Sequence, residues 1–367
     1  MVTGGGTSGH VLPALAVLEE LVDAGHPAES LRFVGAKRGV DRSLLIDEPY
    51  EAVFLPISGL HRSFAPRRVA ANLLLPVRLL RSRIIARRLI RAWRPRVVVS
   101  VGGYASEPMS RAALAAGVPL VCVSYDRIPG LATRRQARRA TSCAVAFPGS
   151  PLPRAVVTGA PVRRKVRTLD RSAVRGAARS AIGAPVDALL LCVTGGSLGS
   201  GTLNEMVPRI LRLMGERPDV SWAVFHVCGT RNLSEDAPVP PSNVWYRRVG
   251  YEPNIPDVYA AADLMLCRAG ASTIAEVAAV GVPAVLVPWP QAADDHQSLN
   301  ARWLTDAGAA VLVTDDQCRH GAGPEVVVSL LADEEVRRRL AAQARSMGSH
   351  SRAGAIAEVV GNAALTA

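Results

Sequence analysis

The stretch LMLCRAGASTIAEVAAVGVPAVLVPWPQAADDHQSLN, residues 264–300, decides how the chain can fold. It opens with a short apolar run, breaks at Gly270 and continues with helical composition to Val280. Gly281 is placed to end that helix in a left-handed conformation, and residues 283–288 form a second apolar run typical of a buried strand. A strand, a helix and a second strand in this order indicate a parallel α/β sheet.

The junction between the first strand and the helix consists of small residues: Gly270, Ala271, Ser272 and Thr273. A helix that begins directly after a strand leaves unpaired N–H groups and partial positive charge at its N-terminus, so a phosphate group is a natural ligand there. Glu276 lies one turn inside the helix. The polar residues that follow, including His296 and Gln297, either form a solvated loop that caps a helix or hold sugar hydroxyls beside the phosphate.

Composition limits the class of protein. A length of 367 residues fits roughly two domains of ~150 residues each, and 49% apolar residues fit a globular chain. The net charge of +12 indicates anionic partners, such as phosphorylated substrates, acidic lipid or nucleic acid. The sequence has no apolar run of ~18 residues and no leader peptide, so we expect a cytoplasmic protein that is soluble or peripheral on the membrane.

The cysteines are scattered along the chain without a C-x-x-C pair. Most lie in or beside apolar runs, so we interpret them as small core residues in a reducing compartment. Their spacing predicts neither a set of disulfides nor a metal site. The six positions are Cys122, Cys143, Cys192, Cys228, Cys267 and Cys318.

A glycine-rich turn, GGGTSGH at residues 4–10, precedes an amphipathic helix. Its G-x-G-x-x-G spacing is a weak signal, because a dinucleotide site also needs a full strand before it and an acidic residue after the second strand. Only residues 1–3 precede the glycines, and the next apolar run ends at Lys37 and Arg38. The pattern therefore argues against a nicotinamide dehydrogenase. It also indicates either an unusually short first strand or a start codon assigned too late.

His10 lies at the mouth of this turn. A helix N-terminus lowers the pKa of an imidazole and favours its neutral form, which suits a general base. The alternative is a histidine whose ring only hydrogen-bonds a loop carbonyl.

Residues 62–96 combine arginine with leucine and isoleucine at helical spacing. Such a segment is either an ordinary surface helix or a helix that also contacts anionic lipid. Only Phe64 and Trp93 supply aromatic rings, so nucleic acid is not expected as a partner.

The strand, glycine turn and helix pattern occurs repeatedly. Residues 97–101 lead into Gly102, Gly103 and Tyr104, and residues 118–123 lead into a polar segment that ends at Arg127. The opening unit returns about 190 residues later, where residues 189–193 precede Gly195, Gly196 and Ser197. We therefore predict two doubly wound, Rossmann-like α/β domains that face a central cleft, at 1–158 and 159–345, with a tail at 346–367 that packs back on the first domain.

Seven short motifs stand in the order found in the MurG-type glycosyltransferases. They are GGGTSGH at 4–10, ISGL at 57–60, GGY at 102–104, GAPVR at 159–163, GGSLG at 195–199, RAGASTIAE at 268–276 and DDHQSLNA at 294–301. The chain therefore resembles this family over nearly its whole length. The resemblance implies a two-domain GT-B enzyme that transfers N-acetylglucosamine from UDP-GlcNAc to lipid I on the cytoplasmic face of the membrane, giving lipid II.

The resemblance also assigns roles to residues. It implies that the turn at 195–197 meets the UDP diphosphate together with 270–273, that Arg163 lies near it, and that Glu276 binds the ribose. His296 and Gln297 would hold sugar hydroxyls. His10 is our candidate base and Asp126 the reserve, and neither a metal nor another cofactor is expected. The acceptor side would consist of Gly6, Thr7, Ser8, Gly9, Gly103 and Tyr104.

The acceptor half departs from the family pattern. The family usually has His-Glu-Gln-Asn where this chain has Val123, Ser124, Tyr125 and Asp126. The acceptor therefore stays open between lipid I and another polyprenyl-phosphate-linked or natural-product acceptor. A UDP-sugar-binding protein without turnover and a dehydrogenase are the remaining alternatives.

Overall fold

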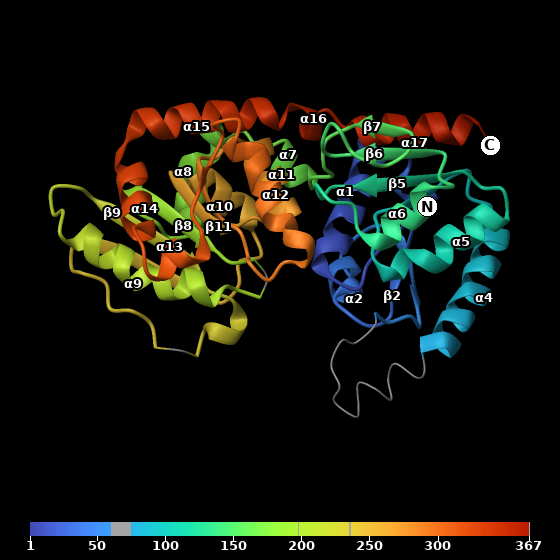
Figure 1. The fold of residues 1–367 in the computed structure, drawn as a ribbon, viewed down its shortest axis with the longest axis horizontal. Helices are drawn as coiled ribbons and strands as arrows, with labels where there is room; N and C mark the ends of the chain where they lie inside the picture. Colours follow the sequence, from blue (N-terminus) through green and yellow to red (C-terminus); the bar gives the residue numbers. More distant parts are fainter. Residues whose placement is uncertain (60–74, 197, 235, 367) are drawn as a thin grey trace. The chain divides into compact units, whose positions relative to one another are not determined.

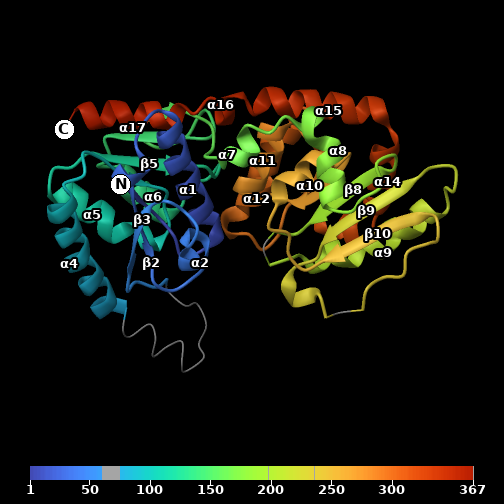
Figure 2. The same cartoon turned by 180° about the vertical axis from the view of Figure 1, so that it is seen from behind.

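The computed structural model describes residues 1–59, 75–196, 198–234 and 236–366. The chain forms two compact units, one of Met1–Arg164 with Ala353–Ala367 and one of Lys165–Arg352 (Figures 1 and 2). Each unit has one parallel sheet with helices packed against it, which confirms the predicted pair of Rossmann-like α/β domains. Helix α17 (Ala355–Leu365) belongs to the first unit, where it contacts α1 and two strands of the sheet.

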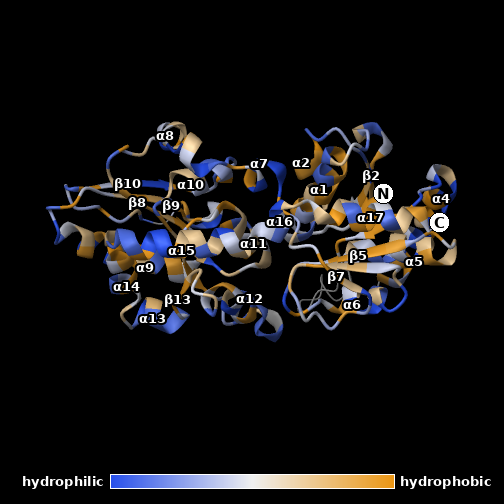
Figure 3. Ribbon diagram, turned by 90° about the horizontal axis from the view of Figure 1, so that it is seen from above, coloured by the Kyte–Doolittle hydropathy of each residue, from blue (hydrophilic) through white to orange (hydrophobic). Residues whose placement is uncertain are grey.

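The first sheet has seven parallel strands in the order β3-β2-β1-β4-β5-β6-β7. Their bounds are β1 (Val2–Thr3), β2 (Arg32–Ala36), β3 (Glu51–Leu55), β4 (Val98–Ser100), β5 (Leu120–Ser124), β6 (Ser142–Val145) and β7 (Ala155–Val157). Strand β1 is short although it lies between β2 and β4, so two residues are enough to pair on both sides. Strand β5 is buried along its length and apolar up to Ser124, as expected for a parallel strand covered on both faces (Figure 3).

The helices of the first unit form two groups. Helices α4 (Leu75–Trp93), α5 (Glu107–Ala115) and α6 (Leu131–Ala137) pack in a row, and α1 (Ser8–Asp23) packs with α17. Short α2 (Asp41–Leu45) contacts α1. None of the helices in the described ranges is long and apolar enough to cross a membrane.

The second sheet has six parallel strands in the order β10-β9-β8-β11-β12-β13. The bounds are β8 (Leu189–Thr194), β9 (Trp222–Val227), β10 (Val244–Val249), β11 (Leu264–Arg268), β12 (Ala284–Val287) and β13 (Val311–Leu312). Residues 264–300 supply β11, α11 (Ala271–Val280) and β12, and β11 and β12 pair in parallel, as predicted. Gly281 ends α11 in the predicted left-handed conformation, with φ 71°.

The remaining helices belong to the second unit, apart from α7 (Arg164–Arg167), which spans the boundary. Helices α9 (Gly201–Gly215), α13 (Asp315–Arg319) and α14 (Gly323–Ala332) pack together, as do α8 (Arg171–Ala181), α10 (Ile255–Ala261), α11, α12 (His296–Thr305), α15 (Glu334–Met347) and α16 (Ser349–Arg352). The six cysteines are buried, which confirms that they are core residues.

A buried ion pair fixes α8 to the sheet of the second unit. The guanidinium of Arg179 is 1% exposed and lies 2.6 Å from the carboxylate of Asp263. Asp263 also accepts the N–H of Leu190 at 2.8 Å, and Arg175 donates to its other oxygen at 2.5 Å. Because Arg179 also donates to the carbonyl oxygens of 185, 186, 188 and 261, its charge is fully hydrogen-bonded inside the domain.

We therefore expect Asp263→Ala to destabilise the second unit by about 3–5 kcal/mol, because it leaves the buried guanidinium of Arg179 without its counter-charge. Urea unfolding followed by tryptophan fluorescence measures this change, because Trp222 is buried in the same unit. Asp219→Ala is the matched control: that carboxylate is 71% exposed and 3.9 Å from Arg217, so its loss should leave the midpoint unchanged. Equal midpoints for both variants would contradict the prediction.

Candidate active site

The turn after β8 brings two loops into backbone-to-backbone contact. Gly195 has no room for a side chain, because a Cβ would lie 2.4 Å from the nitrogen of Ser200. A Cβ on Gly199 would lie 2.1 Å from the carbonyl oxygen of Cys228. Glycine is therefore required at both positions, and the turn delivers the chain directly into the N-terminus of α9.

Gly196 has φ 82° and open space where a side chain would stand. It therefore forms an accessible part of the turn, as a ligand-binding backbone requires. Ser197 lies outside the described residues, so its predicted contact with the diphosphate stays a prediction.

The second predicted turn lies at the start of α11. Gly270 is the N-cap residue and offers no side-chain cap, so the first turn of the helix, residues 271–273, points its N–H groups outward. Strands β8 and β11 are parallel neighbours, so the N-termini of α9 and α11 lie at the same edge of the sheet. Two adjacent helix N-termini form a favourable site for a diphosphate.

Glu276 lies one turn inside α11 and is tied to α10. Its carboxylate accepts a hydrogen bond from the Tyr259 hydroxyl at 2.7 Å. Burial raises the pKa of Glu276 to about 7, and the hydrogen bond from Tyr259 opposes that rise. The carboxylate is thus a hydrogen-bond acceptor whose charge changes near neutral pH.

In the polar segment after β12, one side chain is already hydrogen-bonded to the nearby backbone. Asp294 and Asp295 both have left-handed backbone, with φ 55° and 51°, and α12 begins at His296. The side-chain oxygen of Gln297 accepts the N–H of Trp289 at 3.0 Å. The structure therefore places these residues where the sequence indicated, at the start of a helix in the same unit as Glu276. Their predicted contact with sugar hydroxyls stays a prediction.

Arg268, at the end of β11, joins the loops of this half. Its Nε donates to the hydroxyl of Ser200 at 2.9 Å, and its Nη1 bonds the carboxylate of Asp315. The same nitrogen lies 3.2 Å from the carbonyl oxygens of Val287 and Pro288. One guanidinium thus connects the turn after β8, the end of β12 and the start of α13.

Arg163 belongs to the first unit. Its Nε donates to Glu19 at 2.9 Å and its Nη2 to Glu48 at 2.7 Å. Its guanidinium is therefore already paired with two carboxylates of that unit. Its predicted place beside the diphosphate stays a prediction.

In the first unit the glycine turn after β1 is fixed by a buried carboxylate. Asp41 accepts the N–H of Gly6 at 2.7 Å with one oxygen and the N–H of Ala36 at 2.8 Å with the other. Burial is the main cause that raises the pKa of Asp41. The N–H of Gly6 is thus used inside the fold, whereas Thr7 and Gly9 are exposed and Ser8 is half-buried.

Gly103 and Tyr104 complete this face. The phenol of Tyr104 occupies the space beside Gly6, where a Cβ would lie 2.3 Å from its oxygen. Gly103 has φ 74°, and a Cβ there would lie 2.9 Å from Nε2 of His10. The two predicted acceptor segments, at 6–10 and 103–104, therefore come together.

His10 is held by a side chain from the end of β5. Its Nδ1 lies 2.5 Å from the hydroxyl of Tyr125, and the two rings meet edge-on with centroids 6.3 Å apart. Burial lowers the pKa of His10, while the charge of Asp126 raises it. The sequence predicted a lowered pKa from the helix N-terminus. The direction agrees, but the main cause in the structure is burial.

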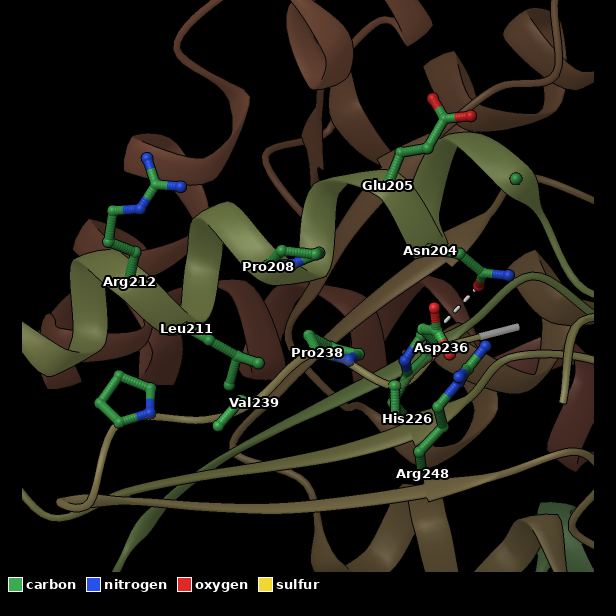
Figure 4. Close-up of a pocket in the computed structure, with 13 residues that line it drawn as sticks. Asn204, Glu205, Pro208, Leu211, Arg212, His226, Asp236, Pro238, Val239 and Arg248 are labelled. Carbon is green, nitrogen blue, oxygen red and sulfur yellow. Dashed lines mark hydrogen bonds between the residues drawn. The ribbon is translucent and has the colours of Figure 1, made fainter. Parts of the chain in front are cut away.

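A separate cavity of about 620 Å³ lies between α9, the strands β9 and β10 and the loop between those strands (Figure 4). None of the predicted donor residues lines it. His226 at its wall is buried, with Nε2 2.9 Å from the Asn204 side-chain oxygen and Nδ1 3.0 Å from the Tyr246 hydroxyl. Burial lowers the pKa of His226 to about 4, so this histidine is neutral.

Three residues that organise these turns were not predicted from the sequence: Asp41, Tyr125 and Arg268. A signal existed for Arg268, because it is the charged last residue of an otherwise apolar strand. Asp41 is a polar residue before a short apolar segment, which suggests only a helix start. Tyr125 was noted only as a departure from a family pattern, and nothing local showed that it contacts His10.

Two family models match the chain. The glycosyltransferase family 28 N-terminal domain matches residues 1–145, and the glycosyltransferase family 28 C-terminal domain matches residues 190–359. Each match covers one of the two parallel sheets almost completely.

Curated relatives match over nearly their full length. A protein of Clavibacter sepedonicus is 38% identical, covering 99% of this chain and 96% of its own length. One of Xylella fastidiosa (strain M12) is also 38% identical, covering 98% and 94%. Both are named UDP-N-acetylglucosamine--N-acetylmuramyl-(pentapeptide) pyrophosphoryl-undecaprenol N-acetylglucosamine transferase.

Solved structures of glycosyltransferases have the same fold as this chain. The crystal structure of Acinetobacter baumannii MurG has a TM-score of 0.70 and 27% identity, covering 99% of this chain and 98% of that one. The glycosyltransferase of kitacinnamycin, at 18% identity, covers 99% and 98% with a TM-score of 0.67 and supports the fold alone. The two parallel-sheet units are those of a GT-B glycosyltransferase, and the chain belongs to the MurG-type glycosyltransferases of family 28.

Proposed function

We propose that this enzyme transfers N-acetylglucosamine from UDP-N-acetylglucosamine to an N-acetylmuramyl-(pentapeptide) pyrophosphoryl-undecaprenol acceptor, that is, lipid I to lipid II in peptidoglycan synthesis. The observation that carries this proposal is the 38% identity, over nearly the full length of both chains, with relatives named for this reaction. The arrangement of the second unit supports the proposal. The N-termini of α9 and α11 favour an anion, and the nearby carboxylate of Glu276 can accept hydrogen bonds from ribose hydroxyls.

The donor is bound by the second unit in this proposal. The amides at the N-termini of α9 and α11 meet the diphosphate and stabilise the negative charge that grows on the departing UDP. Glu276 accepts hydrogen bonds from the ribose, and Gln297 and His296 contact the sugar. Backbone N–H groups stabilise this negative charge without a metal, since the fold already orients them.

The acceptor is bound by the first unit. The acceptor hydroxyl attacks the anomeric carbon from the face opposite to UDP, so a new C–O bond forms as the bond to the diphosphate oxygen breaks and the configuration inverts. The electron pair of the broken bond leaves with UDP. The hydroxyl proton passes to a base, for which His10 is the first candidate and Asp126 the second.

A second acceptor class competes with lipid I. Tyr125 and Asp126 stand where the family pattern has glutamine and asparagine, and Asp126 lines a small pocket with Ser124 and Phe147 at the ends of β5 and β6. This change in the predicted acceptor half favours another polyprenyl-phosphate-linked or natural-product acceptor as the alternative.

Helix α4 supplies a surface suited to an anionic membrane. Val77, Leu80 and Ile84 share one helical face and are 64%, 61% and 44% exposed. Arg81 and Arg88 are exposed on the same face. Apolar side chains flanked by arginine favour the interface of anionic lipid, so we propose that the enzyme is peripheral on the cytoplasmic face of the membrane. Residues 62–74 of the predicted arginine-rich segment 62–96 lie outside the described residues.

The reaction gives a direct test. With a lipid I analogue the purified enzyme should release UDP from UDP-N-acetylglucosamine, and without an acceptor it should release almost none. A coupled assay for UDP measures both rates. UDP release with another polyprenyl-linked acceptor and none with lipid I would favour the alternative, and binding of the donor without release of UDP for any acceptor would leave a nucleotide-sugar-binding protein.

Donor affinity should depend on pH through Glu276. The carboxylate accepts ribose hydrogen bonds best when ionised, and its pKa is about 7, so the affinity for UDP-N-acetylglucosamine should fall as the pH decreases through that value and level off above it. Glu276→Gln should weaken binding by about 1–3 kcal/mol and remove this pH dependence. Isothermal titration calorimetry with UDP-N-acetylglucosamine, whose diphosphate has no group that titrates near pH 7, measures both effects at several pH values. A variant that keeps the affinity and the pH dependence of the wild type would exclude Glu276 from the site.

Binding to vesicles tests the surface of α4. The double variant Arg81→Gln with Arg88→Gln should lose about 2 kcal/mol of affinity for phosphatidylglycerol vesicles at low salt, since each arginine near an anionic surface contributes about 1 kcal/mol. Arg338→Gln with Arg339→Gln, exposed on α15, is the matched control and should bind as the wild type does. Co-sedimentation is the measurement. Equal losses for the two variants would show a general charge effect and reject α4 as the membrane surface.

A further inference from the structure

The hydroxyl of Tyr125 lies between one imidazole and two carbonyl groups. It is 2.5 Å from Nδ1 of His10, 2.7 Å from the carbonyl oxygen of Gly9 and 3.4 Å from that of Val101. The side chain of Tyr125 is buried, so water does not compete freely for these contacts. Three polar atoms thus surround one hydroxyl that carries a single proton.

These contacts determine where the protons lie. A carbonyl oxygen can only accept, and burial raises the pKa of Tyr125 well above its usual value, so the phenol stays protonated and donates to Gly9. Its oxygen is then left to accept, and the contact with His10 is a hydrogen bond only if Nδ1 carries the proton. A neutral imidazole has one N–H group. Nε2 of His10 therefore carries a lone pair.

The Nε2 edge of the ring faces Gly103. A Cβ at this position would lie 2.9 Å from Nε2 and 2.5 Å from Cδ2 of His10. Glycine therefore leaves open the space beside the unprotonated nitrogen that a methyl group would fill. Asp126 acts on the same imidazole through its charge, which favours the protonated ring.

The other buried histidine–tyrosine pair has the opposite arrangement. Nε2 of His226 lies 2.9 Å from the side-chain oxygen of Asn204, so Nε2 carries the proton and Nδ1 accepts from the Tyr246 hydroxyl at 3.0 Å. Both nitrogens of His226 are used inside the fold, and Figure 4 shows the hydrogen bond with Asn204. A tyrosine partner alone therefore does not determine the tautomer, and the carbonyl of Gly9 is what distinguishes the first pair.

We propose that Tyr125 is a positioning residue that holds His10 in the Nδ1–H tautomer and so makes Nε2 the atom that receives the proton of the acceptor hydroxyl. The inference rests on the proposed function, in which His10 is the base. During transfer the hydroxyl proton moves to Nε2, the hydroxyl oxygen bonds the anomeric carbon, and UDP leaves with the electron pair. The resulting imidazolium keeps its Nδ1–H bond to Tyr125.

Nitrogen NMR of protein labelled with [15N]histidine reads the tautomer without any substrate. The chain has seven histidines, and the signals that disappear in His10→Gln belong to His10. At about pH 8, above the usual histidine pKa of about 6.5, the wild type should show a protonated Nδ1 and an unprotonated Nε2. Tyr125→Phe should shift the population toward Nε2–H. Tyr246→Phe removes the phenol of the other pair and should leave the His10 signals unchanged.

Kinetics then test whether the tautomer matters for transfer. Tyr125→Phe should lower kcat about tenfold, part of the 10²–10⁴-fold contribution typical of a general base, and leave the KM for UDP-N-acetylglucosamine unchanged. In the His10→Ala background the same substitution should have no further effect, because Tyr125 acts through His10. Tyr246→Phe should leave kcat unchanged.

Two results would overturn the inference: a wild-type His10 protonated on Nε2, or an effect of Tyr125→Phe that is equally large with and without His10. The second result would show that Tyr125 only supports the loop at Gly9. Failure of transfer with every acceptor would instead reject the proposed function and the role of Nε2 as base, while the NMR tautomer would still test whether Tyr125 positions His10.

Discussion

Close packing at glycine turns, where a side chain has no room, is the constraint on which both halves of the enzyme depend. At Gly195 and Gly199 a single methyl group would come within 2.4 Å and 2.1 Å of other main-chain atoms. The turn after β8 can therefore reach the N-terminus of α9 only when these side chains are absent. Because parallel strands end at one edge of the sheet, the N-terminus of α11 at Gly270 lies beside that of α9, although a Cβ at Gly270 would have no neighbour closer than 4.0 Å.

Each unit places glycine at the turn between a strand and a helix, but the N–H groups of the two turns differ in what they can bind. In the second unit Gly270 caps α11 without a side chain, so the amides of the first turn remain oriented toward a ligand. In the first unit the carboxylate of Asp41 already accepts the N–H of Gly6. A buried carboxylate beside a glycine loop disfavours a second anion at that amide. This difference gives an electrostatic reason for the proposal that the nucleotide binds the second unit, although both units begin with a glycine-rich turn.

Much of this architecture could be predicted from the sequence, because strands, turns and helices are local. The strand and helix of residues 264–280, the left-handed Gly281 and the position of Glu276 follow from periodicity and from glycine placement. The contacts of Arg163, Arg268 and Tyr125 did not follow. Each joins segments distant in the chain, and a shift of about one ångström would change the partner. Sequence spacing does not define distances that small.

The electrostatics of His10 show why such contacts decide chemistry. Burial disfavours the imidazolium and keeps the ring neutral, as a base must be before it accepts a proton. The charge of Asp126 opposes this effect, so in the proposed transfer it would stabilise the imidazolium. Burial therefore favours the neutral ring, and the charge of Asp126 favours the protonated ring. His226 is also buried, but both its nitrogens bond side chains and Arg248 lowers its pKa further. Partners on distant strands therefore determine which histidine can accept a proton.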